Sequence, residues 1–306
     1  MIFWIFVFVV SLYVLIKSAD IFTESAEHIG LKFGLSQMVI GVTIVAFGTS
    51  LPEILSSVFA VVKGNTPIVV GNVMGSNIAN ILLVLGIMAI VGKSVKISSK
   101  HMLNDVAFLI WSVTFFSIFI YTGVFTIIHG ILSLILLAWY LFKTMSYKKI
   151  ELVEKRNFEK KYYAFFPISI LGLYFGAQYT VQGLIVSATS IGLNPAIASA
   201  TFLALGTSLP ELSVCLTALK KKKAELAIGN IIGSNIFNLY GVMGIASLFG
   251  SIYVSRFMIE VVFNHMLLAT LLFMMYVQKK KITRGAGILF VGLYIAFLVN
   301  LLFFGM

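Results

Sequence analysis

Long apolar runs recur along the whole chain, and each is close to the length that crosses a bilayer as a helix, about 20 residues. We expect ten spans, at approximately 2–28, 37–62, 67–91, 102–121, 123–143, 163–186, 195–219, 225–249, 257–277 and 285–304. Of the 306 residues, 60% are hydrophobic and 11% are charged, an apolar share far above that of soluble domains. The runs also lack the alternation of polar and apolar residues typical of a transmembrane barrel. The sequence therefore predicts an all-α integral membrane protein.

Features that could indicate other protein classes have simpler explanations here. The N-terminal run MIFWIFVFVVSLYVLI lacks a basic n-region and a small-residue cleavage site, so we interpret it as a retained first span. The single cysteine, Cys215, excludes an internal disulfide and is interpreted as a small apolar residue of a helix. The four histidines are scattered and show no metal-ligand spacing. We expect no cofactor.

The basic residues predict how the spans are oriented. If the N-terminus lies outside, all of the 22 lysines and arginines except Lys63 and Arg256 fall in inner connections or at inner span ends. By the positive-inside rule, both termini are then extracytoplasmic and the longest connection, 146–163, is cytoplasmic in a multi-pass plasma-membrane protein. The net charge of +11 is thereby explained by topology, without a nucleic-acid partner. The 146–163 connection is too short to form a folded domain.

Two phrases occur twice with the same separation. GTSLPE stands at 48–53 and 206–211, and GNxxGSNIxN stands at 71–80 and 229–238, so both recur after 158 positions. The chain is therefore read as a duplicated unit: residues 1–145 form one five-helix repeat, 146–163 a linker, and 164–306 the second repeat. Because five is odd, the second copy must be inverted in the membrane. Inverted repeats are frequent in secondary transporters, whose substrate sites lie at the midplane between the repeats.

Each GTSLPE phrase lies near the middle of its span and contains a proline. Pro52 cannot donate a hydrogen bond to the carbonyl of Gly48, and the same holds for Pro210 and Gly206. We expect both helices to kink or unwind there and to free carbonyl oxygens. In lipid, irregular backbone survives only where it faces protein or a water-filled cavity.

The glutamates that end these phrases need a partner. An ionised residue at mid-membrane costs at least about 2.5–3.5 kcal/mol on insertion scales. No basic residue lies at the depth of Glu53 or Glu211 in any predicted span, so the partner is expected to be a soluble cation or a proton. The same absence of a nearby histidine or lysine argues against an intramembrane hydrolase with Ser50 or Ser208 as nucleophile.

The second phrase adds neutral oxygen ligands. Ser76 and Asn80 are four residues apart and share a helix face, as Ser234 and Asn238 do in the second copy. Carboxylates surrounded by hydroxyl, amide and carbonyl oxygens are typical of sites for hard cations. Two negative charges suit one Ca²⁺ or two Na⁺, and mutually exclusive occupancy of such a site is the chemical basis of ion exchange.

With both motifs duplicated and ten spans arranged as five plus five, the sequence resembles the Na⁺/Ca²⁺ exchangers of the cation/Ca²⁺ exchanger superfamily, in their short prokaryotic form. The resemblance implies electrogenic exchange of three Na⁺ for one Ca²⁺ by alternating access, with the first and sixth spans sliding against the rest. It implies Ca²⁺ ligands at Glu53, Glu211, Thr49 and Thr207. It implies Na⁺ ligands at Ala46, Ser50, Ser76, Ala204, Ser208 and Ser234 together with the two glutamates. Asn80 and Asn238 would line the central cavity.

The chain departs from some relatives in two ways. Certain prokaryotic and K⁺-dependent relatives carry aspartate at the position of Asn238, so we expect no K⁺ co-transport here. The long regulatory Ca²⁺-binding loop of animal relatives has no counterpart in residues 146–163. Two other functions remain open at this point: a Ca²⁺/H⁺ antiporter that uses the same glutamates, and a cation channel.

Overall fold

The computed structural model describes residues 2–64, 66–96, 102–147, 159–190, 206 and 208–304. Within these ranges the fold is almost entirely helical, and nine helices are long and apolar enough to cross a membrane. The prediction of an all-α membrane protein is confirmed. The first part of the expected span at 195–219 and most of the linker at 146–163 lie outside the described residues, so the total of ten spans stays a prediction.

Most helices and strands of the first half have a counterpart in the described part of the second half, where the π-helix η4 is additional. The first half contains α1 (Ile2–Lys32), α2 (Gln37–Ile40), the π-helix η1 (Gly41–Val45), α3 (Ala46–Val62), α4 (Pro67–Ile78), the π-helix η2 (Ala79–Val84), α5 (Leu85–Val91), β1 (Ser94–Lys96), α6 (Met102–Ile120), β2 (Val124–Phe125) and α7 (Ile127–Tyr147). The second half contains α8 (Lys161–Ser190), α10 (Leu209–Lys220), α11 (Ala224–Ile236), the π-helix η3 (Phe237–Val242), α12 (Met243–Ser247), β3 (Ile252–Tyr253), the π-helix η4 (Met258–Val262), α13 (Phe263–Gln278), β4 (Lys281–Thr283) and α14 (Arg284–Phe304).

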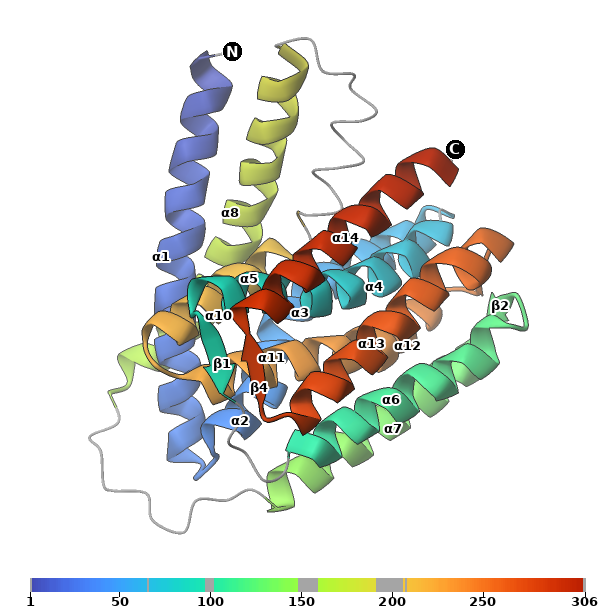
Figure 1. The fold of residues 1–306 in the computed structure, drawn as a ribbon, viewed down its shortest axis with the longest axis horizontal. Helices are drawn as coiled ribbons and strands as arrows, with labels where there is room; N and C mark the ends of the chain where they lie inside the picture. The colour runs from blue at the N-terminus through green and yellow to red at the C-terminus, as the bar shows by residue number, and fades with distance from the viewer. Residues whose placement is uncertain are drawn as a thin grey trace.

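Two short two-stranded ribbons join the halves, and each ribbon takes one strand from each half. β1 pairs antiparallel with β4, placing Val95 opposite Ile282, and β2 pairs antiparallel with β3, placing Val124 opposite Tyr253. Moving each residue of one pair by 158 positions produces the other pair. Such reciprocity is what a two-fold relation between the halves requires. Figure 1 places β1 and β4 at one end of the tilted helices and β2 at the other.

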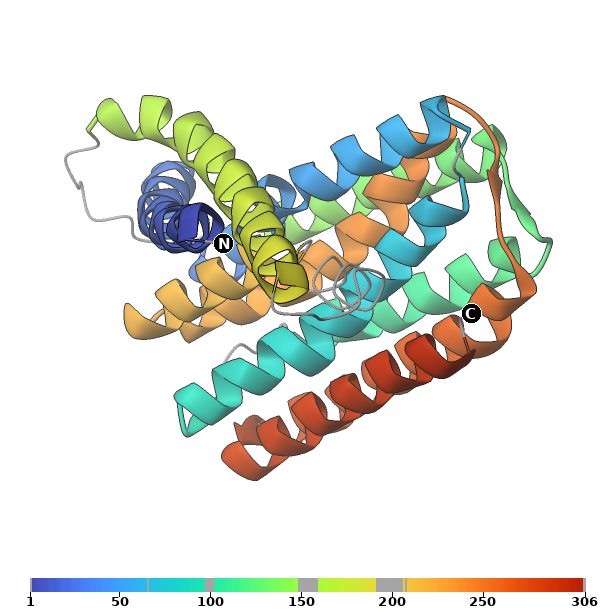
Figure 2. The same cartoon turned by 90° about the horizontal axis from the view of Figure 1, so that it is seen from above.

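The first helices of the two halves, α1 and α8, pack mainly against each other. They stand side by side at one edge of the bundle and run in a different direction from the remaining helices (Figures 1 and 2). Gly176 lets α8 approach closely, because a Cβ there would lie 2.9 Å from the backbone of Leu15. The hydroxyl of Thr180 also donates to that of Ser11 over 3.0 Å. Small and hydroxyl-bearing residues are the usual means of close helix packing in membranes.

The span formed by α11, η3 and α12 lies at the centre of the bundle. Its most apolar stretch is completely buried inside the protein. Gly229 of α11 and Gly41 of η1 touch, and a Cβ on Gly229 would lie 2.6 Å from the carbonyl oxygen of Met38. This crossing brings the second copy of GNxxGSNIxN against the helix that carries the first copy of GTSLPE.

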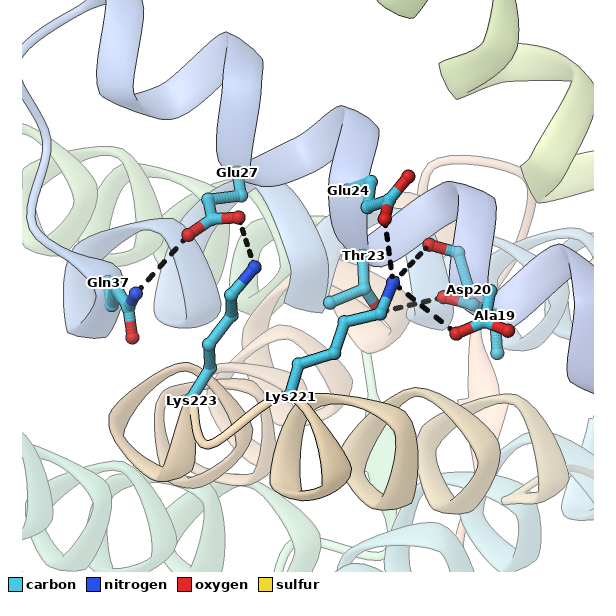
Figure 3. A network of polar contacts seen from close by, with 8 residues as sticks. All are labelled: Ala19, Asp20, Thr23, Glu24, Glu27, Gln37, Lys221 and Lys223. Atoms are coloured by element: carbon cyan, nitrogen blue, oxygen red, sulfur yellow. Dashed lines mark hydrogen bonds and ion pairs between the residues drawn. The ribbon is translucent and has the colours of Figure 1, made fainter.

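Ion pairs fasten α1 to the turn between α10 and α11 (Figure 3). The Nζ atom of Lys221 lies 3.3 Å from Asp20 Oδ1 and 3.2 Å from Glu24 Oε1. Lys223 donates to Glu27, whose other carboxylate oxygen accepts a 3.3 Å hydrogen bond from Gln37 at the start of α2. The acids lie three to four residues apart and therefore share one face of α1.

Candidate functional site

The two glutamates of the repeated GTSLPE phrases come together in the interior of the bundle. Glu53 lies on α3 and Glu211 in the first turn of α10, and both side chains are fully buried. The two carboxylates are near enough to repel each other. Among the described residues, none of the four carboxylate oxygens has a hydrogen-bond partner of good geometry. Two neighbouring buried carboxylates without partners form a centre of negative charge that needs a cation or protons.

Further buried polar atoms lack partners in the described part of the chain. Among the predicted ligands, they are the hydroxyls of Ser50 and Ser208 and both side-chain polar atoms of Asn80 and Asn238, and Asn77 and Asn235 of the same phrase each have an unbonded oxygen as well. All six residues are at most 1% exposed. Each unsatisfied buried polar group costs about 1–3 kcal/mol, so a protein retains several of them together only where something binds. Of the predicted hydroxyl and amide ligands, Ser50, Ser208, Asn80 and Asn238 are thus buried without a hydrogen-bond partner among the described residues, whereas Ser234 is bonded to Thr49 and Asn230.

Thr49 connects the two halves at the centre of the site. Its Oγ1 lies 3.2 Å from the Oδ1 of Asn230 and 3.2 Å from the Oγ of Ser234, both on α11. It also lies 3.3 Å from the carbonyl oxygen of Ala46, one turn earlier in α3. The structure therefore places Ala46, Thr49 and Ser234 close together, and their roles as ion ligands stay a prediction. The equivalent contacts of the other half involve Ala204 and Thr207, which lie outside the described residues.

The expected unwinding at Pro52 is wrong. α3 remains α-helical from Ala46 to Val62 with Pro52 inside it, and the irregular stretch is the π-helix η1, just before it. Proline removes one donor from the helix, and neighbouring helices in a membrane protein can absorb that loss without a break. In the second copy, α10 begins at Leu209, which places Pro210 in the first turn, where its missing N–H is harmless.

The glycines of GTSLPE leave space that side chains of α1 and α8 occupy. A Cβ on Gly48 would lie 2.5 Å from the ring of Phe22 on α1, and a Cβ on Gly206 would lie 2.6 Å from Val181 on α8. Gly206 and Val181 also line a cavity of about 270 Å³, together with both prolines and Gln178. The cavity borders Pro52 and Pro210, the residues that directly precede the two glutamates, so it lies next to the carboxylate centre.

Sequence reasoning gave no role to the first asparagine of GNxxGSNIxN, although the structure gives one to both copies. Asn72 donates to the carbonyl oxygen of Glu53 over 3.5 Å and to Ser57 Oγ over 3.1 Å. Asn230 accepts from Thr49 and donates to Cys215 Sγ over 3.4 Å. The signal was available, because the asparagine recurs at the same place in both phrases.

The chemistry of the site is that of oxygen ligands. The described residues contain no group of three or more histidine, cysteine, aspartate or glutamate side chains that would hold a metal ion. The centre offers two carboxylates, with hydroxyl and amide oxygens around them. Such ligands suit Na⁺ and Ca²⁺ rather than softer transition metals.

Comparison with known proteins also indicates a protein that handles Na⁺ and Ca²⁺. The profile described as sodium/calcium exchanger protein matches residues 3–145 and 161–303, and each matched segment contains one copy of GTSLPE. The chain belongs to the sodium/calcium exchanger family.

Relatives within this family cover almost the whole chain. An uncharacterized membrane protein of Methanocaldococcus jannaschii is 34% identical over 96% of both chains. The sodium/calcium exchanger MaX1 of Methanosarcina acetivorans is 29% identical over 94% of this chain and 95% of its own. A solved structure of the sodium-calcium exchanger NCX_Mj, soaked with Na⁺ and Sr²⁺, has a TM-score of 0.85 at 33% identity and covers 98% of this chain and 99% of its own. Members of the exchanger family are transporters.

Proposed function

We propose that this protein is an antiporter that exchanges Na⁺ for Ca²⁺ across the membrane by alternating access. The observation that carries the proposal is the buried pair Glu53 and Glu211, whose carboxylate oxygens have no hydrogen-bond partner in the described residues. An oxygen-rich centre with two negative charges is neutralised by one Ca²⁺ or two Na⁺. Family membership and the fold shared with NCX_Mj support the same assignment.

The ligand assignment rests on the resemblance to the family, and the burial of Glu53, Glu211 and Thr49 supports it. Ca²⁺ binds the two glutamates with the backbone carbonyls of Thr49 and Thr207. Na⁺ binds the neighbouring hydroxyls and carbonyls and shares the glutamates, and Asn80 and Asn238 lie between the sites. With both glutamates ionised, the Ca²⁺-loaded centre is neutral and a centre loaded with three Na⁺ carries one positive charge. A cycle that exchanges three Na⁺ for one Ca²⁺ therefore moves one net charge.

Alternating access uses the α1–α8 pair as the moving part. These helices pack chiefly on each other, and their side chains fit onto the glycines beside the site. Displacing the pair would open or close the cavity next to Pro52 and Pro210. The two halves are inverted with respect to the membrane, which the reciprocal ribbons at opposite ends of the bundle support.

In the cell, the protein lies in the plasma membrane with both termini outside and residues 146–163 and 220–223 inside. The distribution of basic residues supports this orientation. Cysteine labelling with an impermeant reagent tests it. Reagent added outside should mark Asn65→Cys and leave Lys221→Cys unmodified, and the reverse pattern would overturn the orientation.

The deciding experiment is uptake of radioactive calcium into proteoliposomes with and without an outward Na⁺ gradient. We expect uptake to require the gradient and to respond to membrane potential set with valinomycin, because each cycle moves charge. Uptake driven by a proton gradient without Na⁺ would indicate a Ca²⁺/H⁺ antiporter. Uptake that needs no counter-ion would indicate a channel, and Na⁺-driven flux indifferent to potential would indicate neutral exchange.

A further inference from the structure

The side chain of Asn230 lies at a junction behind the ion site. Its Oδ1 receives hydrogen bonds from Thr49 Oγ1 at 3.2 Å and from Ser234 Oγ at 3.4 Å. Its Nδ2 points the other way and donates to Cys215 Sγ at 3.4 Å. The thiol of Cys215 donates in turn to the carbonyl oxygen of Ala227, also at 3.4 Å. Asn230 and Cys215 are both fully buried.

These bonds fix a direction for the whole chain of donors. The carbonyl of Ala227 can only accept, so the thiol donates to it and keeps its sulfur lone pairs for the amide of Asn230. The NH₂ group of Asn230 must then face Cys215, which leaves its oxygen facing Thr49 and Ser234. Both hydroxyls can donate to that oxygen. Each hydroxyl that does so keeps its own lone pairs free on the side away from Asn230.

The orientation matters because a cation binds oxygen lone pairs and is repelled by hydroxyl hydrogens. Without the Asn230 oxygen, the acceptors left to these two hydroxyls are the carbonyl oxygen of Ala46, 3.3 Å from Thr49 Oγ1, each other at 3.2 Å, and the buried carboxylates. A hydroxyl donating to Glu211 would occupy a carboxylate lone pair and present its hydrogen to the ion. A donor network that is held in one direction avoids both effects before the ion arrives.

The first half contains the matching arrangement. Asn72 stands 158 positions before Asn230, and its Nδ2 donates to Ser57 Oγ over 3.1 Å, at the position equivalent to Cys215. The acceptor behind the amide is thus a hydroxyl in one half and a thiol in the other. In both halves this side chain accepts a hydrogen bond from the asparagine amide. The hydrogen bond is therefore preserved between the halves, although the accepting atom is oxygen in one and sulfur in the other.

We propose that Asn230, oriented by Cys215, is a positioning residue for Na⁺ binding, which it promotes by holding the Ser234 hydroxyl with its lone pairs toward the ion and by keeping the Thr49 hydroxyl from donating to a carboxylate. The inference rests on the proposed Na⁺/Ca²⁺ exchange and names residues outside the ligand set. It predicts that the network affects Na⁺ more than Ca²⁺. Ser234 is a proposed Na⁺ ligand through its hydroxyl, whereas Thr49 is proposed to bind Ca²⁺ through its backbone carbonyl.

The test measures Na⁺ and Ca²⁺ dependence separately in Asn230→Ala, Cys215→Ala and Cys215→Ser. A hydrogen bond contributes about 0.5–1.5 kcal/mol, which corresponds to a change in affinity of about twofold to tenfold. Asn230→Ala should therefore raise the half-saturating Na⁺ concentration several-fold and leave the maximal rate and the half-saturating Ca²⁺ concentration much less changed. Cys215→Ala should give a smaller change of the same kind. Cys215→Ser restores a donor and acceptor and should behave like the wild type.

A second measurement, the melting temperature, detects Na⁺ binding without a transport assay. Na⁺ that binds the folded state raises the melting temperature of the purified protein, so the Na⁺-dependent rise should be reduced in Asn230→Ala and Cys215→Ala and restored in Cys215→Ser. If Asn230→Ala does not fold, the two Cys215 variants carry the test. A wild type that neither exchanges Ca²⁺ for Na⁺ nor is stabilised by Na⁺ would refute the proposed function itself. A wild type that does both, with alanine variants that match it or that lose Na⁺ and Ca²⁺ affinity equally, would refute the positioning role alone.

Discussion

The α3–α4 turn and the α10–α11 turn occupy equivalent places in the two halves, yet their contacts differ. Lys63 and Lys221 are equivalent, and each is followed by a residue in the left-handed region, Gly64 with φ 77° and Lys222 with φ 60°. The second turn carries a run of lysines that reaches the acids of α1 (Figure 3). The backbone of the turn is conserved between the halves, whereas its charge is not.

The partners of the lysines are also confined to one half. Asp20, Glu24 and Glu27 on α1 correspond to Gln178, Gln182 and Ile185 on α8. The glutamate-bearing phrase is therefore identical in the two halves, while the charged residues that hold α1 to the α10–α11 turn have no counterparts on α8. The two halves thus have the same glutamate-bearing phrases but different charged contacts at the helix ends. Each prediction below tests one side of that statement.

The largest effect is expected from the glutamates, where the halves are alike. Glu53→Gln and Glu211→Gln keep the side-chain volume but each removes half of the charge that offsets Ca²⁺. Both should lower Na⁺-driven calcium uptake by at least about tenfold, the equivalent of 1.4 kcal/mol. Unchanged melting temperature and membrane insertion would serve as the folding control. Wild-type rates in both variants would refute the site, and a loss in only one would refute equal use of the two halves.

The next effect concerns the central asparagines, which also match across the halves. Asn238→Asp adds a third carboxylate beside Glu53 and Glu211, and three such groups resist being ionised together, so they titrate as a coupled set. The variant should gain a sensitivity to pH or to K⁺ that the wild type lacks at saturating Na⁺. Transport assayed over a range of pH and K⁺ checks this. Wild-type exchange that stops without K⁺, or a variant that matches wild type under all conditions, would contradict it.

A smaller effect is expected where the halves differ. Glu27 is 8% exposed, and Lys223 is its partner. Removing one member of a buried pair leaves a buried charge uncompensated, so Lys223→Gln should loosen α1 and change the maximal exchange rate several-fold without changing ion half-saturation.

The double variant Glu27→Gln/Lys223→Gln removes both charges and should recover part of the wild-type rate, as a mutant cycle for coupled residues requires. Lys63→Gln is the matched control in the other turn and should leave the rate unchanged. An equal change from Lys63→Gln would show that the two turns are not distinguished by their ion pairs.

The smallest effect is expected from the turn backbone. A left-handed residue with a Cβ costs about 1 kcal/mol relative to glycine, so Lys222→Gly should raise the melting temperature slightly. Gly64→Lys should lower it by a similar amount, since a Cβ on Gly64 has no neighbour within 4 Å and only the backbone conformation opposes it. Opposite signs for the two substitutions would confirm that the turns share one geometry, and equal signs would contradict it.

The sequence predicts the helices well because bilayer length and apolar runs constrain them strongly. The expected span at 102–121 is Met102–Ile120 in the structure, and the span at 285–304 is Arg284–Phe304. The buried glutamates were predictable as well, since their cost in lipid demands a partner. The unwinding predicted at Pro52 failed because the rule for proline describes an isolated helix, whereas α3 is supported by its neighbours.

Contacts between distant parts of the chain were not predictable. Nothing in the local sequence indicates that Asn230 contacts Thr49, or that Lys223 reaches Glu27, because both pairs are brought together only by the fold. Cys215 was interpreted as a small apolar residue, and its role as an acceptor for Asn230 appears only when α10 and α11 are packed. The repeat was the one long-range signal in the sequence, and it identified equivalent positions without showing their contacts.

The reciprocal ribbons also determine when their strands can pair as the chain is synthesised. Each ribbon takes one strand from before residue 147 and one from after residue 159, so β1 and β2 leave the ribosome with unpaired edges and wait for the second half. The first half therefore cannot finish assembling until most of the polypeptide has been made. For the same reason, if the chain were expressed as two fragments divided within the 146–163 connection, the β1–β4 and β2–β3 pairings would help the fragments to associate.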